Sequence, residues 1–100
     1  MIEHVVMWKL LEEAEGYSAE ENFERAKKAL LALPEKISVI RSLDVKRNFN
    51  PDAKNADMIL LSSFDTLEDL AYYAGHPEHL LVGALIGKIT TGRAAIDYVV

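Results

Sequence analysis

The side chains best suited to acid–base chemistry in this 100-residue chain are three histidines and a tyrosine that lies close to two of them. Tyr73, His76 and His79 fall within the stretch YYAGHPEHLL, and His4 lies near the N-terminus. The chain has no cysteine, which excludes disulfides, thiolate nucleophiles and thiolate metal ligands. Any catalysis therefore depends on histidine, carboxylate, tyrosine, serine or lysine.

His79 is a candidate general base because it shares a helical stripe with Val82 and Ile86, so its ring should face apolar surroundings. Such surroundings disfavour the imidazolium and keep the ring neutral near pH 7, ready to abstract a proton from an activated methylene. Tyr73 can then donate a hydrogen bond to the developing enolate oxygen. The alternative is structural: His79 bonds a backbone carbonyl and joins helix to sheet.

His76 lies between Gly75 and Pro77, where we expect one helix to end and another to begin. A residue before proline is driven out of the helical region, so His76 is predicted to be a cap or linker. The three-residue spacing of His76 and His79 also suggests a pair of metal ligands. Because His76 precedes the helix and no third ligand has a recognisable spacing, we predict neither a metal nor a cofactor.

His4 alternates with Val6 and Trp8 along an N-terminal strand, so it should lie either in the helix-covered core or in a cavity between two chains. We predict that His4 and Trp8 line a pocket. The alternative for His4 is a hydrogen-bonded core histidine. Trp8 and Phe49 are also expected to contribute to the core, since large aromatic side chains dominate burial in small domains.

The elements that position these residues follow from apolar periodicity and from capping signals. Ser18 and Glu21 have the spacing of a capping box, Thr66 is a second helix cap, and Pro34 should close the first helix. Gly75 should end the second helix in a left-handed conformation, and Thr90-Thr91-Gly92 should form a turn. Strands are predicted over 1–10, 40–49, 58–64 and 93–100, and helices over 18–34, 66–75 and 77–88.

This order predicts one α+β domain over 1–100 with the ferredoxin-like split βαβ arrangement, β-α-β-β-α-β, around a four-stranded antiparallel sheet. Helices cover one face of such a sheet and leave the other bare. Three of the strands nevertheless carry apolar residues on both faces, and a large exposed apolar patch marks an interaction site. We therefore expect a homodimer, a dimeric α+β barrel, in which two sheets pack face to face.

Composition excludes several partners. The formal net charge is −5 and the basic residues occur only in small pairs, which argues against nucleic acid. The apolar runs are far shorter than the 18 or more residues of a membrane span, so no membrane partner is predicted. The N-terminal stretch MIEHVVMWKLLEEAE lacks a basic n-region and a small-residue cleavage site, which predicts a cytoplasmic protein.

Three stretches make the chain resemble the stress-responsive A/B barrel domain (Dabb) family of the dimeric α+β barrel superfamily over essentially its whole length. The stretches are MIEHVVMWKL, IRSLDVKRNFN, and FDTLEDLAYYAGHPEHLLV followed by RAAIDYVV. The resemblance implies a homodimeric barrel and, for most members, no assigned biochemical activity. The plant members with a known role are either stress proteins or a polyketide cyclase, olivetolic acid cyclase, which performs an aldol-type ring closure without a cofactor.

The resemblance to that cyclase implies roles for particular residues. Tyr73 and His79 match its catalytic tyrosine and histidine, and His4 matches a histidine that lines the same pocket. The resemblance also favours placing His4 in the cavity between the two chains. We therefore expect a protein of unassigned activity with a pocket for a small apolar carbonyl compound. The alternatives are a polyketide cyclase-like acid–base enzyme, a non-enzymatic stress or scaffold protein, and a relative of antibiotic-type or haem-degrading monooxygenases.

Overall fold

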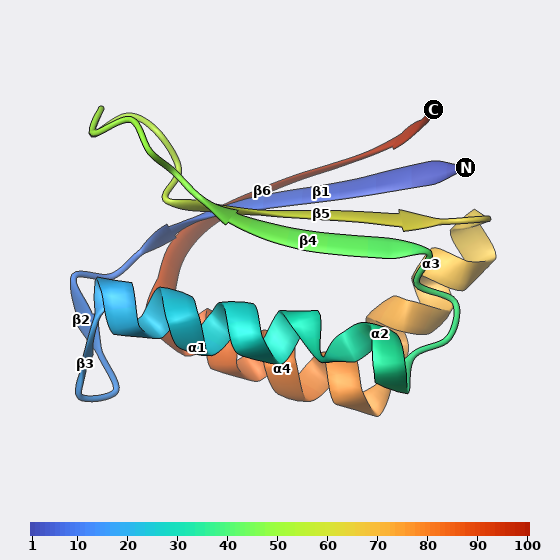
Figure 1. Cartoon of the computed structure of the whole chain (residues 1–100), viewed down its shortest axis with the longest axis horizontal. Helices are drawn as coiled ribbons and strands as arrows, with labels where there is room; N and C mark the ends of the chain where they lie inside the picture. Colours follow the sequence, from blue (N-terminus) through green and yellow to red (C-terminus); the bar gives the residue numbers. More distant parts are fainter.

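Four strands form a single antiparallel sheet in the computed structural model, which describes all 100 residues (Figure 1). The strand order is β4-β5-β1-β6, so β1 pairs with both β5 and the C-terminal β6. The bounds are β1 Ile2–Leu10, β4 Ser42–Arg47, β5 Met58–Phe64 and β6 Thr90–Val99. This topology confirms the predicted ferredoxin-like α+β fold.

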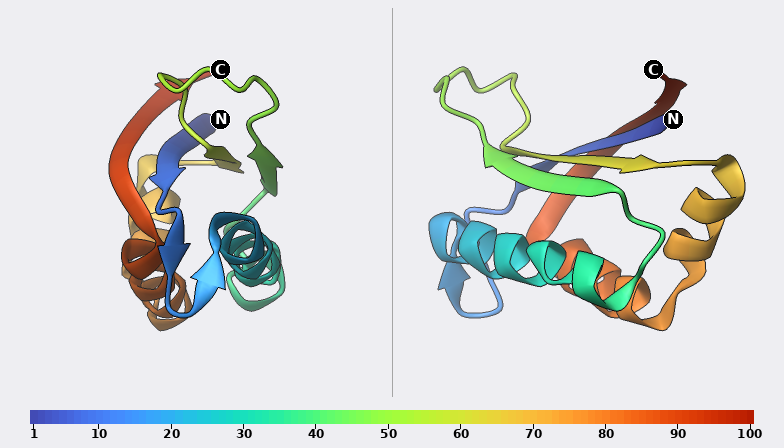
Figure 2. Two further views of the ribbon diagram at one scale, coloured as in Figure 1. Left: turned by 90° about the vertical axis from the view of Figure 1, so that its left-hand side faces the viewer. Right: turned by 45° about the vertical axis from the view of Figure 1, so that its right-hand side comes forward.

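All of the helices lie on one face of the sheet (Figures 1 and 2). They are α1 Ala19–Leu31, α2 Leu33–Lys36, α3 Leu67–Gly75 and α4 Pro77–Ile89. α1 begins at the predicted capping box, in which the Ser18 hydroxyl accepts from the Glu21 amide and the Glu21 carboxylate accepts from the Ser18 amide. α1 ends at Leu31, so Pro34 does not close it and instead lies in the first turn of α2.

A small hairpin precedes α1, formed by β2 Glu13–Ala14 and β3 Tyr17–Ser18. Its turn places Glu15 and Gly16 at φ values of 55° and 82°, a pair of positive angles typical of a tight hairpin turn. The 17-residue apolar core lies between the helices and the sheet and includes Phe23 and Leu30 of α1.

The break between α3 and α4 occurs at His76. The prediction that Gly75 ends α3 in a left-handed conformation is wrong. Gly75 is helical, whereas His76 is extended, with φ −68° and ψ 136°. The residue before Pro77 is excluded from the helical region, which explains why the chain breaks at this position. His76 then caps α4, because its Nδ1 accepts a hydrogen bond from the Glu78 amide at 3.1 Å.

The second predicted strand is shorter than the sequence pattern indicated, and Phe49 does not belong to the core. β4 ends at Arg47, and the side chain of Asn48 exchanges hydrogen bonds with the backbone of Asn50. Such local bonds compete with strand pairing. Phe49 therefore lies in the loop 48–57, which extends beyond the face of the sheet that the helices leave bare (Figure 1), and its side chain is 99% exposed.

The predicted turn at Thr90-Thr91-Gly92 is part of β6. Thr90 follows α4 directly, and its hydroxyl donates to the Ile86 carbonyl at 2.7 Å. The pairing with β1 shifts register between Trp8 and Lys9, and Gly92 absorbs the local bend with φ 70°.

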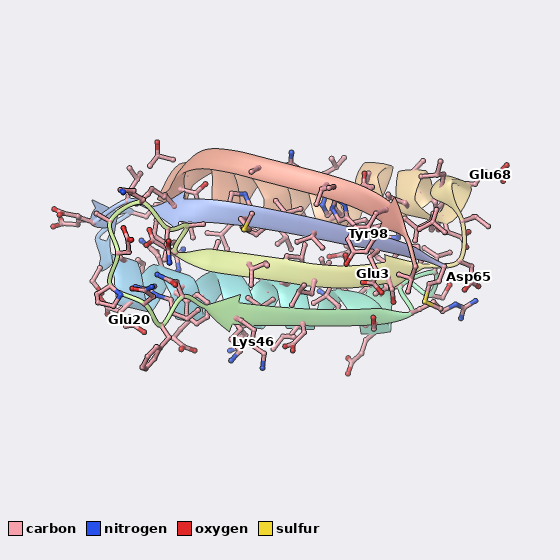
Figure 3. All side chains as sticks on the ribbon, turned by 90° about the horizontal axis from the view of Figure 1, so that it is seen from above. Glu3, Glu20, Lys46, Asp65, Glu68 and Tyr98 are labelled. Carbon is pink, nitrogen blue, oxygen red and sulfur yellow. The ribbon has the colours of Figure 1, made fainter.

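The face of the sheet opposite the helices carries apolar side chains on its three adjoining strands β5, β1 and β6. The strand registers assign to this face Val5, Met7, Ile59, Leu61, Ala94, Ile96 and Tyr98. Figure 3 looks onto this bare face, where Glu3, Lys46 and Tyr98 project from β1, β4 and β6. None of the helices has the length and apolar character needed to cross a membrane.

Candidate active site

A cavity of about 350 Å³ lies between α4 and the helix-covered face of the sheet. His4 and Trp8 of β1, Tyr73 of α3 and His79 of α4 all line it. The structure therefore brings together the four residues that the sequence analysis selected as catalytic or pocket-lining. His76 does not line the cavity, and its ring is engaged in capping α4.

His4 lies on the helix-covered face of its own chain, the first of the two predicted positions, and not in the cavity between two chains that the resemblance favoured. Its ring is 6.3 Å from that of Tyr73 and 6.5 Å from that of Phe64, measured between centroids. The register of β1 and β6 places Asp97 opposite, with its Oδ1 atom 2.5 Å from His4 Nδ1. With the proton on Nδ1 donated to this carboxylate, the second ring nitrogen of His4 remains available to a ligand.

Tyr73 is packed between two other aromatic rings and is only 1% exposed. Its ring centroid lies 5.0 Å from that of Phe64 and 4.3 Å from that of His79. The hydroxyl oxygen is buried and has no hydrogen-bond partner in the protein. Burial raises the pKa of Tyr73 to about 12. The group is therefore a neutral phenol with an unused donor, and it belongs to a side chain that lines the cavity.

His79 has one ring nitrogen engaged with the backbone. Its Nδ1 lies 2.9 Å from the Ala74 carbonyl oxygen, and since a carbonyl only accepts, Nδ1 carries the proton. Burial lowers the pKa of His79; the Ala74 hydrogen bond opposes this shift, while the charges of His4 and Arg93 add to it. The ring is thus neutral at pH 7, and Nε2 has a free lone pair.

Two charged residues of the site, Arg93 and Asp97, were not predicted from the sequence, and both lie on β6. Arg93 lines the cavity and pairs in register with Trp8, as Asp97 does with His4. Strict alternation along the last strand is the signal that could have assigned them to the same face. Gly83 and Gly87 were also missed; they line the cavity from α4, and glycines inside a helix suggest a specific requirement because they disfavour the helix.

No group of three histidine, aspartate or glutamate side chains is positioned to hold a metal ion. The cavity instead offers a neutral base in His79, a buried donor in Tyr73 and a carboxylate-bound imidazole in His4. These groups can move a proton between carbon and nitrogen while an oxygen anion is stabilised by hydrogen bonding.

A ferredoxin-like sheet with a cavity under its helices defines the structural class of this protein. The family model described as the stress responsive A/B barrel domain matches residues 2–100, and the chain belongs to that family. A dimeric protein of unknown function with a ferredoxin-like fold from Bacteroides fragilis is 38% identical, with a TM-score of 0.82, over 97% of this chain and 93% of that one.

Two further solved structures share the fold at low sequence identity. A hydroxynitrile lyase from Passiflora edulis is 11% identical, with a TM-score of 0.84, over 99% of this chain and 92% of that one. A putative antibiotic biosynthesis monooxygenase from Nitrosomonas europaea is 14% identical, with a TM-score of 0.76, over 98% of this chain and 96% of that one. Among curated proteins, none matches this sequence significantly.

Proposed function

We propose that this protein binds a small carbonyl compound in the cavity and catalyses cofactor-free proton transfer at the carbon next to the carbonyl. The observation that carries the proposal is the pairing of His79 with Tyr73. A neutral imidazole with a free Nε2 lies in ring contact with a buried phenol whose hydroxyl has no partner. A substrate carbonyl would supply the hydrogen-bond acceptor that the Tyr73 hydroxyl lacks.

The reaction begins when His79 Nε2 takes a proton from the α-carbon. The C–H electron pair moves into the enolate, and its negative charge collects on the oxygen that accepts from Tyr73. The imidazolium then returns the proton, or the enolate carbon attacks a second carbonyl carbon of the same molecule and forms a C–C bond. In that aldol-type closure the new alkoxide takes the proton held by His79. A positioned general base of this kind contributes roughly 10²–10⁴-fold in rate.

The bare face of the sheet supports a homodimer as the assembly in which this cavity operates. Its exposed apolar residues would be covered by a second copy of the same face. The 38% identical Bacteroides protein is described as dimeric. Because the cavity lies on the opposite, helix-covered side, a dimer formed in this way leaves its lining residues within one chain.

Exchange of the α-hydrogens of 2-hexanone in D₂O, followed by NMR, tests the proposed chemistry without knowledge of the natural substrate. We expect exchange above the rate given by free imidazole at the same concentration. His79→Gln should remove most of this excess, and Tyr73→Phe should lower it by about tenfold or more, as loss of an oxyanion donor does.

His76→Asn is the matched control, because it replaces the one histidine outside the cavity with a residue that can still cap α4. It should leave the exchange rate unchanged. Exchange no faster than with imidazole, or exchange that survives His79→Gln in a folded protein, would favour the structural interpretation, in which the histidines serve only to join helix and sheet.

A further inference from the structure

Arg93 is a cation without a counter-ion at the cavity. Its cross-strand partner on β1 is Trp8, which carries no charge. No carboxylate lies within ion-pair distance of the Arg93 guanidinium. The arginines at positions 25, 41 and 47 differ, because each is paired with an aspartate or glutamate. Asp97, the nearest acidic residue along the same face of β6, is bound to His4.

The cavity lining contains no aspartate or glutamate at all. Arg93 is therefore the only permanently charged side chain of the lining. Of the two histidines that line the cavity, His79 is neutral at pH 7, and the residues other than Arg93, His4 and His79 carry no ionic charge. The chain as a whole has a formal net charge of −5, so this local positive charge opposes the general repulsion of anions.

Three glycines line the same cavity as Arg93. Gly83 and Gly87 of α4 and Gly92 of β6 line the cavity, and a Cβ atom added to any of them would meet no atom within 4 Å. At these three positions the lining therefore consists of backbone rather than side chains. The volume of about 350 Å³ suits a compound of modest size.

We infer that the ligand of this cavity is an acid, with a carboxylate held by the Arg93 guanidinium while its apolar part enters toward Tyr73 and His79. The planar guanidinium matches a carboxylate with two parallel hydrogen bonds, which a neutral amide does not reproduce. The inference rests on the proposed function for the reacting carbonyl. The carboxylate bound by Arg93 and the carbonyl beside Tyr73 together define a keto acid as the substrate class. The anion preference can be tested by binding alone.

Hexanoate and hexanamide are suitable probes because they share one carbon skeleton and differ in charge. Each is titrated into the ¹⁵N-labelled protein, and NMR shifts of the Gly83, Gly87 and Gly92 amides report on the cavity. We expect millimolar hexanoate to shift these amides and to bind about tenfold more tightly than hexanamide, the gain expected for a charge-assisted pair that is partly exposed. Added salt should weaken only hexanoate.

Arg93→Gln should abolish this preference and leave hexanamide unaffected. Lys28→Gln is the matched control, because it removes the same charge from an exposed residue of α1 that does not line the cavity. Equal binding of the two probes, an unchanged preference in Arg93→Gln, or no shift of these amides with hexanoate would each overturn the inference.

The two proposals fail separately. Loss of the hexanoate preference with intact 2-hexanone exchange would overturn the acid ligand and leave the proton-transfer chemistry standing. Specific hexanoate binding without any exchange would identify an acid-binding protein and overturn the proposed catalysis.

Discussion

Tyr73 combines a fully buried ring with a hydroxyl that the protein leaves without a hydrogen bond. A buried polar group without a partner costs about 1–3 kcal/mol, so the fold carries a penalty at this position. A ligand oxygen would remove that penalty on binding. His79 offers an acceptor where Tyr73 offers a donor. Its hydrogen bond to the Ala74 carbonyl fixes the tautomer and leaves Nε2 unprotonated.

Tyr73→Phe separates stability from function. We expect the free energy of unfolding to stay constant or to rise by about 1 kcal/mol, because the change deletes an unpaired buried hydroxyl and keeps the ring contacts with Phe64 and His79. The measurement is urea denaturation followed by circular dichroism. A loss of more than about 1 kcal/mol would contradict the account, since it would mean that the hydroxyl makes a stabilising bond.

His79 should make the stability of the protein depend on pH in a defined direction. Its pKa is lowered from 6.5 in the folded chain, mainly by burial, so in the window below pH 6.5 the unfolded chain binds the proton first. The free energy of unfolding should therefore fall as the pH drops through that window. The base catalysis should fall as well, since Nε2 becomes protonated.

His79→Gln provides the comparison for this pH effect. Urea denaturation of both proteins between pH 7.5 and about 5 should give a steeper loss of stability on acidification for the unsubstituted chain, because only it has a titrating ring at this position. Parallel pH profiles for the two proteins would show that burial does not lower the pKa of His79.

At the scale of elements, α4 and β6 determine the shape of the site. α4 presents glycines four residues apart to the cavity, at positions 83 and 87, which is unfavourable for a helix by about 1 kcal/mol each relative to alanine. β6 supplies two residues of opposite charge on one face, Arg93 and Asp97, which do not pair with each other. α4 is thus less stable as a helix where its glycines line the cavity. β6 adds a positive charge to the same lining through Arg93.

Gly83→Ala should stabilise the protein and impair the site. The added methyl meets open space, so we expect a gain of about 0.5–1 kcal/mol in the free energy of unfolding. The same methyl protrudes into the cavity and should weaken hexanoate binding and slow 2-hexanone exchange.

Gly75→Ala serves as the control for this substitution. Gly75 is helical, has the same open surroundings and does not line the cavity, so its replacement should leave binding and exchange unchanged. Equal binding by the Gly83→Ala variant and the unsubstituted protein would mean that ligands do not occupy this side of the cavity.

At the scale of the whole molecule, the two faces of the sheet differ in what they carry. Its helix-covered face holds the core and the cavity, whereas its bare face carries apolar side chains such as Val5, Met7 and Ile96. In the proposed dimer, the chain would assemble through the bare face without obstructing the cavity. The loop 48–57, with the exposed Phe49, extends beyond the bare face (Figure 1).

Leu61→Lys tests this assembly. Leu61 lies between Val5 of β1 and Asp44 of β4 on the bare face. A lysine there would lose its hydration in a dimer, a cost that the neighbouring carboxylate does not offset, whereas in a monomer it would stay solvated. Light scattering should give about twice the 11.2 kDa chain mass for the unsubstituted protein and a single chain mass for the variant.

Leu67→Lys is the matched control, because Leu67 is an exposed leucine of α3 on the helical side. It should remain dimeric. A mass of 11.2 kDa for the unsubstituted protein would contradict the face-to-face dimer, as would a dimer that persists in Leu61→Lys.

The sequence alone determined the features that depend on neighbouring residues. The Ser18–Glu21 capping box, the break before Pro77 and the alternation along the strands act within a few residues, so their patterns predict the helix starts, the strand faces and the ferredoxin-like order. The same local signals failed where a competing local bond intervened: Asn48 turns the chain after Arg47, and Phe49 is expelled from the core.

Only the tertiary structure decided how the last strand contributes to the site. His4 and Asp97 are 93 residues apart, and they meet because the register of β1 against β6 sets them opposite one another. Arg93 and the α4 glycines likewise acquire a common environment only when the last strand lies beside the first. Strand register follows from the packing of a whole face into the core, a collective free energy that no short stretch of sequence specifies.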